Sequence, residues 1–411
     1  MPVIRPSRPA QLTAVALMGA LALAACGDKS SPKSTSSTAG SSASTAAGSP
    51  VLVGLINDEN GPISVPELTT GANAAVSYIN STNGVNGHPI QLVHCASDGT
   101  AESTLSCANQ MITKKVVAVT MGQVGSADAA VKPLEEAGIP IFAVTAQGQT
   151  APNDPKVTYL SASQLLTFQG VFKFFKAVNV SKPFLAAPDA GPATKILADT
   201  ALVPAAKAVG ITLTYNLFNP ASPDFAAAVT AAKSNGSDAL FVLSTESDCT
   251  NFVKTAKQLG WNKIIFGGSC NQFVKALGAQ AADAYSLSYL VPPGAIATAP
   301  ASTKAAVQTY IDQMKVAGAS ADADSVFAEN GFSDIMTLAA ALKTTTGDIT
   351  AATAAPAILS FKGDIFAGGA VDCAARPAPG GTCGHLFVAL QAKADGTQTV
   401  VGGDFIDAAT P

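Results

Sequence analysis

The residues that could perform covalent catalysis are few and scattered. A hydrolase needs a nucleophile beside a positioned base, and the chain has only three histidines, His88, His94 and His385. It contains no Gly-x-Ser-x-Gly elbow, no Gly-x-Gly-x-x-Gly turn and no Gly-Lys-Ser/Thr phosphate loop. We therefore assign no catalytic residue, and we expect neither an enzyme nor a bound cofactor.

Six of the seven cysteines fall into close pairs, which predicts disulfides. Six cysteines allow about 15 connectivities, and we expect nearest-neighbour pairing because each pair lies within one supersecondary unit. A zinc site at Cys373, Cys383 and His385 is the alternative, but no CxxC or HxxxH spacing accompanies them, so we expect no metal. The expected disulfides are Cys95–Cys107, Cys249–Cys270 and Cys373–Cys383.

The seventh cysteine, Cys26, follows a secretory signal. Arg5 and Arg8 precede the apolar run 12–25, which is too short to cross a hydrocarbon core of ~30 Å. The run ends in Leu-Ala-Ala-Cys, which resembles the bacterial lipobox, although ordinary cleavage that leaves Cys26 unmodified is the alternative. We expect residues 1–25 to be a lipoprotein signal peptide and Cys26 to carry the lipid.

Residues 26–50 consist almost entirely of Ser, Thr, Ala, Gly and Pro. Such a segment cannot bury enough apolar surface to fold, and as a flexible tether it reaches about 25–30 Å. Removing residues 1–25 takes away two of the 24 basic residues, so 22 basic residues face 28 acidic ones, a net charge of −6. An acidic body gains nothing from anionic lipid, so we expect the lipid to hold the protein at the outer face of the cell membrane.

The composition excludes several other classes of protein. The 411 residues are 48% hydrophobic and 13% charged, with a net charge of −4, so a wholly disordered chain is excluded. No basic patch for a nucleic acid is visible, and the only long uncharged apolar run lies at the N-terminus. The length exceeds the ~250–300 residues at which one core stops growing, which indicates two domains.

From residue 51 onward, the part of the chain that must position any site alternates short apolar runs with stretches of helical periodicity. Strands are expected at 51–56, 90–95, 116–121 and 139–144, with helices between them. The alternation resumes with strands at 183–187, 211–218, 239–243, 263–266 and 285–290, and helices return at 302–317, 327–343 and 351–359. Such βα repeats predict an α/β fold with parallel sheets. A last hairpin at 385–393 and 397–401 lies outside the pattern and suggests that the chain returns to an earlier domain.

Two segments resemble a known family. They are Gly71-Ala-Asn-Ala-Ala-Val-Ser-Tyr-Ile-Asn80 and Gly84-Val-Asn-Gly-His-Pro-Ile90. Both resemble the first helix and turn of type I periplasmic binding proteins, in the Leu/Ile/Val-binding branch of ABC-transporter solute receptors. Weaker matches are Glu136-Ala-Gly-Ile-Pro-Ile141 and Lys257-Gln-Leu-Gly260, and the resemblance spans roughly 51–400.

The resemblance implies two doubly wound parallel-sheet lobes joined by three crossovers. We place lobe one at 51–162 and 291–384, and lobe two at 163–290 and 385–411. Solute would bind in the cleft between the lobes and close it by a hinge motion. In open α/β sheets, ligands sit beyond the carboxyl ends of the strands, which points to the same location.

In lobe one, the resemblance implies ligand contacts from the loops after the strands. Ser126 is a candidate for ligand contact or for capping its own helix. Thr145 matches a backbone contact of the family. Gln147 stands where the family usually has Thr, with a solvated loop residue as the alternative. Ser64 stands near the place of an aromatic gate.

In lobe two, the family commonly has an aromatic residue and an ammonium-binding carboxylate, and both are missing here. Asp189 and Glu246 could replace the lost charge or be ordinary loop acids, and Asn271 lies in the loop that usually holds the carboxylate. The ligand expectation is therefore a small polar solute: an amino acid, an amide or a short carboxylate.

The function implied is a lipid-anchored, extracytoplasmic solute-binding protein of an ABC importer. Its partners would be the solute, the permease and ATPase subunits and the membrane, with no nucleic acid, and we expect a monomer. A sensor of the same fold that signals to a partner protein is the alternative, and a hydrolase is a more distant one.

Overall fold

The computed structural model describes residues 46–61, 64–189, 191–244, 246–267, 270–377 and 380–409. The expected signal peptide, Cys26 and nearly all of the tether lie outside these residues. Among the described residues, no helix has both the length and the apolar composition needed to cross a membrane.

The first sheet has five parallel strands in the order β2-β1-β3-β4-β5. The part of the chain built around it is called lobe one below. Alternate side chains of a strand point to opposite faces, and in β1 Val53 and Leu55 join one core while Ile56 joins another. The strands are β1 (Val51–Asp58), β2 (Ile90–Ser97), β3 (Ala118–Met121), β4 (Ile141–Ala143) and β5 (Val157–Tyr159).

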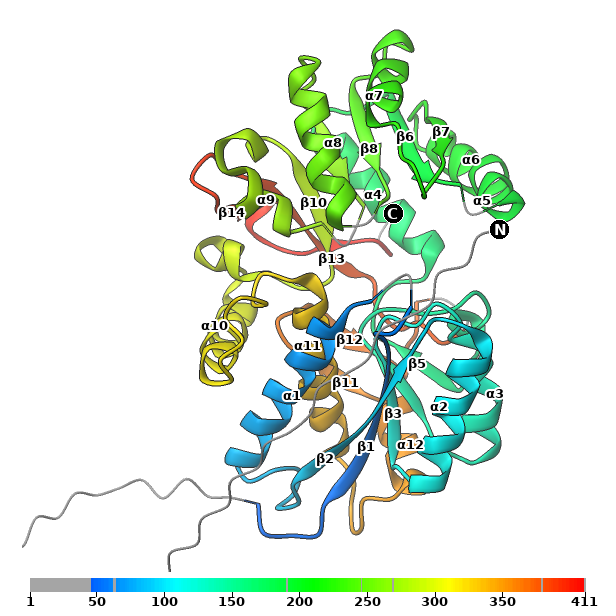
Figure 1. The fold of residues 1–411 in the computed structure, drawn as a ribbon, viewed down its shortest axis with the longest axis vertical. Helices are drawn as coiled ribbons and strands as arrows, with labels where there is room; N and C mark the ends of the chain where they lie inside the picture. Colours follow the sequence, from blue (N-terminus) through cyan, green and yellow to red (C-terminus); the bar gives the residue numbers. More distant parts are fainter. Residues whose placement is uncertain are drawn as a thin grey trace, which may run out of the picture. The chain divides into compact units, whose positions relative to one another are not determined.

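Helices cover both faces of this sheet (Figure 1). One face carries α2 (Ala101–Lys114) and α3 (Asp128–Glu136), and the other carries α1 (Pro66–Ser81) and α11 (Val326–Leu342). Near them lie α10 (Ala301–Val316), α12 (Ala351–Leu359) and the hairpin of β11 (Lys362–Asp364) and β12 (Ala370–Asp372).

Helices α1 and α11 pack with their backbones in contact. A methyl group on Gly71 would lie 2.0 Å from the Ala328 carbonyl oxygen, and one on Gly331 would lie 2.0 Å from the Leu68 carbonyl oxygen. Glycine is therefore required at both positions, and α11 is held at a fixed place beside α1, although about 250 residues separate them in the chain.

The second sheet, around which lobe two is built, has the order β14-β13-β10-β9-β8-β6-β7. Strands β6 to β10 are parallel, whereas β13 runs antiparallel to β10 and β14. The strands are β6 (Pro183–Pro188), β7 (Thr214–Phe218), β8 (Ala239–Val242), β9 (Ile264–Phe266), β10 (Tyr285–Ser288), β13 (Leu386–Ala392) and β14 (Gln398–Val400), with β15 (Ile406–Asp407) beside β13.

Helices cover this sheet on both faces as well. One core contains residues of α4 (Gln164–Ala177) and α6 (Val203–Ala208), and the other contains residues of α7 (Phe225–Ser234), α8 (Glu246–Gln258) and α9 (Gln272–Leu277). Helix α5 (Pro192–Leu197) leads through a π-helical turn at Ala198–Leu202 into α6. Four short 3₁₀ turns at Ala151–Asn153, Gly278–Ala281, Pro293–Thr298 and Val401–Gly403 complete the elements.

The α/β architecture with parallel sheets and the returning hairpin are confirmed. The chain passes between the sheets after β5, after β10 and before β13. Several details differ from the expectation. Strands β5, β11, β12 and β15 were not predicted. Strand β7 begins at Thr214 instead of Ile211, because Ile211 follows the helix-ending Gly210 and packs into the core beside α4 and α6.

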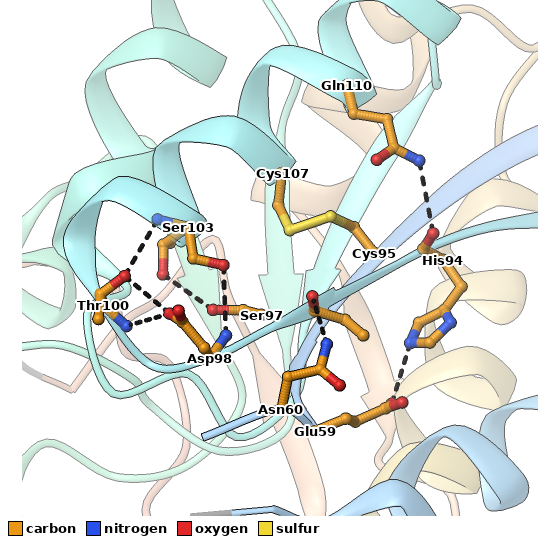
Figure 2. Close-up of a disulfide and its surroundings, with 12 residues drawn as sticks. Glu59, Asn60, His94, Cys95, Ser97, Asp98, Thr100, Ser103, Cys107 and Gln110 are labelled. Atoms are coloured by element: carbon orange, nitrogen blue, oxygen red, sulfur yellow. Dashed lines mark hydrogen bonds and ion pairs between the residues drawn. A yellow bond between two sulfur atoms is a disulfide. The ribbon is translucent and has the colours of Figure 1, made fainter. Parts of the chain in front are cut away.

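The three expected disulfides are formed: Cys95–Cys107, Cys249–Cys270 and Cys373–Cys383. Figure 2 shows the first, which ties β2 to α2. No group of three or more potential metal ligands occurs among the described residues.

Candidate ligand-binding site

A cavity of about 200 Å³ opens beyond the carboxyl ends of the strands of lobe one and is also lined by residues of lobe two. Its apolar side chains include Val171, Leu287 and Phe387 from lobe two and Leu68, Met121 and Phe327 from lobe one. Its polar side chains are Gln123, Thr145, Gln147, Asn330 and Asp334 from lobe one, with Ser288, Thr167 and Tyr289 opposite. A cavity of this size accepts a compact organic molecule.

The polar residues that end β1 fix the first loop of the cavity. The Asn57 side chain donates to the Val65 carbonyl (2.9 Å) and accepts the Gln123 N–H (3.2 Å). Asp58 accepts the Gly125 N–H at 2.7 Å. Both side chains are fully buried, so these bonds are shielded from water and hold the loop that carries Gln123.

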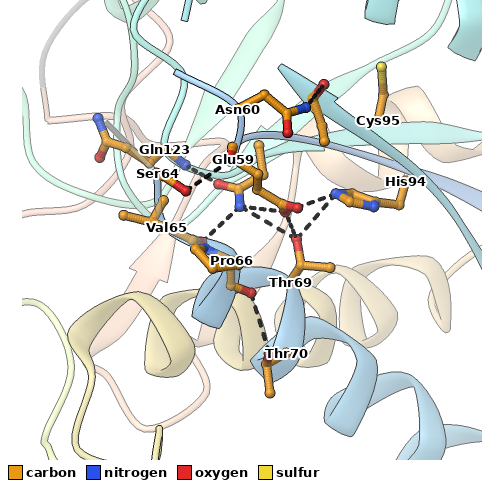
Figure 3. Close-up of polar contacts among 12 residues, drawn as sticks. Glu59, Asn60, Ser64, Val65, Pro66, Thr69, Thr70, His94, Cys95 and Gln123 are labelled. Atoms are coloured by element: carbon orange, nitrogen blue, oxygen red, sulfur yellow. Dashed lines mark hydrogen bonds and ion pairs between the residues drawn. The ribbon is translucent and has the colours of Figure 1, made fainter. Parts of the chain in front are cut away.

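A second polar cluster, formed by Glu59, Thr69 and His94 (Figure 3), contacts the Asn57 side chain through Glu59 and Thr69. Glu59 Oε1 accepts hydrogen bonds from the Asn57 amide and the Thr69 hydroxyl, and it lies 2.9 Å from His94 Nε2. His94 also lies 3.4 Å from the Thr69 hydroxyl. Glu59, Thr69 and His94 do not line the cavity, so the cluster positions the first loop without touching a ligand there.

The second loop, after β4, is fixed by Asp128 at the start of α3. Its carboxylate accepts the N–H groups of Gln149, Thr150 and Ala151 at 2.9–3.2 Å. Burial alone would raise the pKa of Asp128, but these hydrogen bonds together outweigh it and lower the pKa. Gln147 in this loop accepts the Val124 N–H at 3.4 Å, which links the two loops.

Asp334 reaches the cavity from α11 and is 2% exposed. Its Oδ1 accepts the Val144 N–H at 2.5 Å. Burial raises the pKa of Asp334 to about 8, because the bond from Val144 offsets only part of the desolvation. The side chain is therefore mainly an uncharged carboxylic acid at neutral pH. Glu329, on the same helix, is also buried, and burial raises its pKa well above the ordinary value.

Two of the seven predicted ligand residues, Thr145 and Gln147, lie in the wall of this cavity. Ser126 and Ser64 do not line it. The Ser126 hydroxyl donates to the Gly99 carbonyl (2.7 Å), and the Ser64 hydroxyl donates to the Glu59 carbonyl (2.8 Å). Neither serine caps a helix here, and both brace the loops.

The three candidates from lobe two also lie outside the lining of this cavity. Asp189 accepts the Gly191 N–H at 2.9 Å in an exposed turn. Glu246 accepts the N–H groups of Asn271 and Gln272 at 2.6–3.1 Å, and burial raises its pKa to about 7. Asn271 borders a smaller pocket instead, beside Lys275 and Gln398.

Sequence reasoning missed most of the cavity wall. Phe327, Asn330 and Asp334 come from α11, and Leu287 and Phe387 come from β10 and β13. The sequence signal was the pair of acidic residues Glu329 and Asp334 inside a largely apolar helix, where a charge is expensive unless it has a partner.

Residues 50–397 match the family described as periplasmic binding protein. Because the match covers most of the chain, the protein belongs to this family, as its residues 71–90 suggested. No curated protein matches the sequence.

Solved structures with the same fold include solute-binding proteins of ABC transporters. The branched-chain amino acid binding protein LivJ from Streptococcus pneumoniae, in complex with isoleucine, is 18% identical, with a TM-score of 0.66 over 85% of this chain and 99% of its own. The leucine-binding protein LivK from Thermotoga maritima is 17% identical, with a TM-score of 0.68 over 87% of this chain and 99% of its own. A solute-binding protein from R. palustris, in complex with 4-hydroxybenzoate, is 18% identical, with a TM-score of 0.68 over 85% of this chain and 95% of its own. At these identities the likeness shows the fold alone.

Proposed function

We propose that the protein is the extracytoplasmic solute-binding component of an ABC importer and captures a small polar solute in the cavity between its lobes. The observation that carries the proposal is the cavity itself. It lies beyond the carboxyl ends of parallel strands, where ligands bind in open α/β sheets, and both lobes line it. The solute is an amino acid, an amide or a short carboxylate, in keeping with the compact volume. The similar structures with isoleucine and with 4-hydroxybenzoate support solutes of this size.

Capture proceeds by hinge closure in this proposal. Thr145 and Gln147 hold the solute from lobe one while the wall formed by Val171, Leu287 and Phe387 of lobe two closes over it. Three connecting segments, after β5, after β10 and before β13, act as the hinge. Small-angle X-ray scattering with and without solute tests the motion, and a radius of gyration that no bound solute changes would refute it.

The direct test of capture is thermal unfolding of residues 50–411 with a panel of amino acids, amides, sugars and organic acids. A ligand at 100 times its Kd stabilises a protein by about 2.7 kcal/mol. Thr145→Ala and Gln147→Ala should abolish the shift, whereas Thr113→Ala on the exposed face of α2 should preserve it. The absence of a shift across the whole panel would argue against solute capture.

Membrane attachment through a lipid on Cys26 completes the proposal. The Leu-Ala-Ala-Cys end of the signal segment and the acidic body support it. Cys26→Ser should release the folded protein into the soluble fraction, and recovery of this variant in the membrane pellet would contradict the lipid anchor. Partnership with a permease and an ATPase is tested by co-purification and by solute uptake in vesicles. Solute binding without uptake would favour a sensor.

A further inference from the structure

Three backbone N–H groups at the strand ends of lobe one that could hold an anionic ligand are bonded to the protein's own side chains. In the first loop, the N–H of Gln123 donates to Asn57, and the N–H of Gly125 donates to Asp58. In the second loop, the N–H of Val144 donates to Asp334. Anions are favoured at such strand ends because of free N–H groups, and here side-chain oxygens occupy them.

Carboxylates of the protein fill the neighbouring sites in the same way. Asp128 takes the N–H groups of residues 149–151, and in lobe two Glu246 takes those of Asn271 and Gln272 at the start of α9. Neither carboxylate lines the cavity, and the N–H groups that they bind are not available to a ligand carboxylate. The described lining of the cavity also contains no Lys, Arg or His to compensate.

A ligand ammonium group is no better accommodated. Of the acids, only Asp334 lines the described cavity wall, and it is tied to the Val144 N–H. Burial raises its pKa, so at neutral pH it offers a neutral acid and not a negative charge. Glu246 and Asp189, the sequence candidates for an ammonium partner, bond backbone N–H groups outside the lining.

The residues that the structure does not describe cannot supply the missing charge from within the body. Between residues 46 and 409, every one of them is of a type that does not ionise: Pro62, Ile63, Ala190, Thr245, Gly268, Ser269, Ala378 and Pro379. None of these residues could therefore add a charge to the lining that the structure describes.

Neutral polar side chains of the described cavity wall, in contrast, are available to a ligand. Among the residues that the structure describes, the side chains of Gln123, Thr145 and Asn330 make no hydrogen bond within the protein. They line the cavity together with Gln147. A carboxamide both donates and accepts hydrogen bonds, and thus matches an amide or a hydroxyl group. The opposite wall adds the apolar side chains of Leu287 and Phe387 beside the neutral polar ones of Thr167, Ser288 and Tyr289.

We infer that the cavity selects an uncharged ligand: a compact molecule with an apolar body and a neutral amide or hydroxyl head, in preference to its carboxylate, ammonium or zwitterionic counterparts. The inference rests on the proposed function and narrows its ligand. Transfer of a charged head into this site would leave it without a counter-charge, which is expensive in a buried environment.

The test is calorimetric titration and thermal shift at pH 7 with sets of ligands of matched shape and different charge. One set is isovaleramide, isovalerate, isoamylamine and leucine, and the other is phenylacetamide, phenylacetate, phenethylamine and phenylalanine. The amide of at least one set should bind ten times or more tightly than each charged member. Tighter or equal binding of a charged member in both sets overturns the inference and leaves solute capture intact. A complete lack of binding overturns both.

A charge placed in the cavity gives an independent readout. Asn330→Lys should raise the affinity for isovalerate or phenylacetate about tenfold or more, because Asn330 lines the cavity and its side chain makes no described hydrogen bond. Asn109→Lys, on the exposed face of α2, is the matched control with the same added charge. The inference is wrong if the wild type already binds carboxylates and neither variant changes the affinity for them.

Discussion

The burial of Asp334 leads to a prediction about protein stability that can be tested without a ligand. Its side chain is buried, and its pKa rises from the ordinary value of 3.8 to about 8 in the folded protein. A group with a raised folded-state pKa contributes stability that is present below the unfolded value and is lost as the pH rises towards the folded value. Asp334 therefore destabilises the protein progressively between pH 4 and pH 8.

The size of the effect follows from the two pKa values. Between them, each pH unit changes the free energy of unfolding by roughly 1.4 kcal/mol. Over the interval from pH 5 to pH 7 the loss from this one group is thus on the order of 3 kcal/mol. Asp334→Asn keeps an oxygen for the Val144 N–H but cannot ionise, so the variant should escape this loss.

The assay is urea unfolding of wild type and Asp334→Asn at pH 5, 6 and 7 without ligand. From pH 5 to pH 7, the difference in unfolding free energy should grow by on the order of 3 kcal/mol in favour of the variant. Glu329 and Glu246, whose pKa values are also raised, are present in both proteins, so their contributions cancel. Parallel pH profiles for the two proteins would refute the reasoning.

Three further perturbations test other parts of the fold. Asp128→Asn should destabilise the protein by about 1 kcal/mol at pH 7. Because the pKa of Asp128 is lowered in the folded protein, the difference from wild type should shrink as the pH falls below the ordinary value of 3.8; a difference independent of pH would contradict this. Gly71→Ala should lower the free energy of unfolding by about 2–4 kcal/mol through the clash with the Ala328 carbonyl. The control Asn73→Ala, at an exposed position on the same helix, should change it little. Similar melting temperatures for the two variants would exclude close backbone packing. Replacing Cys249 and Cys270 by Ala should lower the free energy of unfolding by about 3 kcal/mol, as expected for a disulfide that closes a loop of this length. An unchanged urea midpoint would show that the bond does not constrain the unfolded chain.

Much of the fold was predictable because short stretches of the sequence indicate its helices and strands. The run Val51–Ile56 and the helix with Leu68, Ala72 and Ile79 show their periods within a few residues. Strand β5 was not predicted, since a strand of three residues, Val157–Tyr159, is too short to show a period. The start of β7 was placed too early because Ile211 is apolar for core packing and not for strand pairing.

The site was less predictable than the fold for a related reason. Thr145 and Gln147 could be found because the topology of a parallel sheet places strand-end loops together. Phe327, Asp334 and Phe387 reach the cavity from elements more than 170 residues further along the chain, and no local pattern encodes that approach. The bonds that occupy Asp58, Glu246 and Ser126 depend on backbone geometry, which residue types alone do not specify.

The backbone contact between α1 and α11 has a consequence for the order in which the chain can fold. Helix α1 cannot acquire its final neighbour until residues 326–342 have been synthesised, and lobe two likewise lacks β13 until residue 392 exists. Contacts that span so much of a chain form slowly. During synthesis, lobe one therefore cannot complete its fold before residues 326–342 have been made, and lobe two cannot complete its fold before β13 has been made.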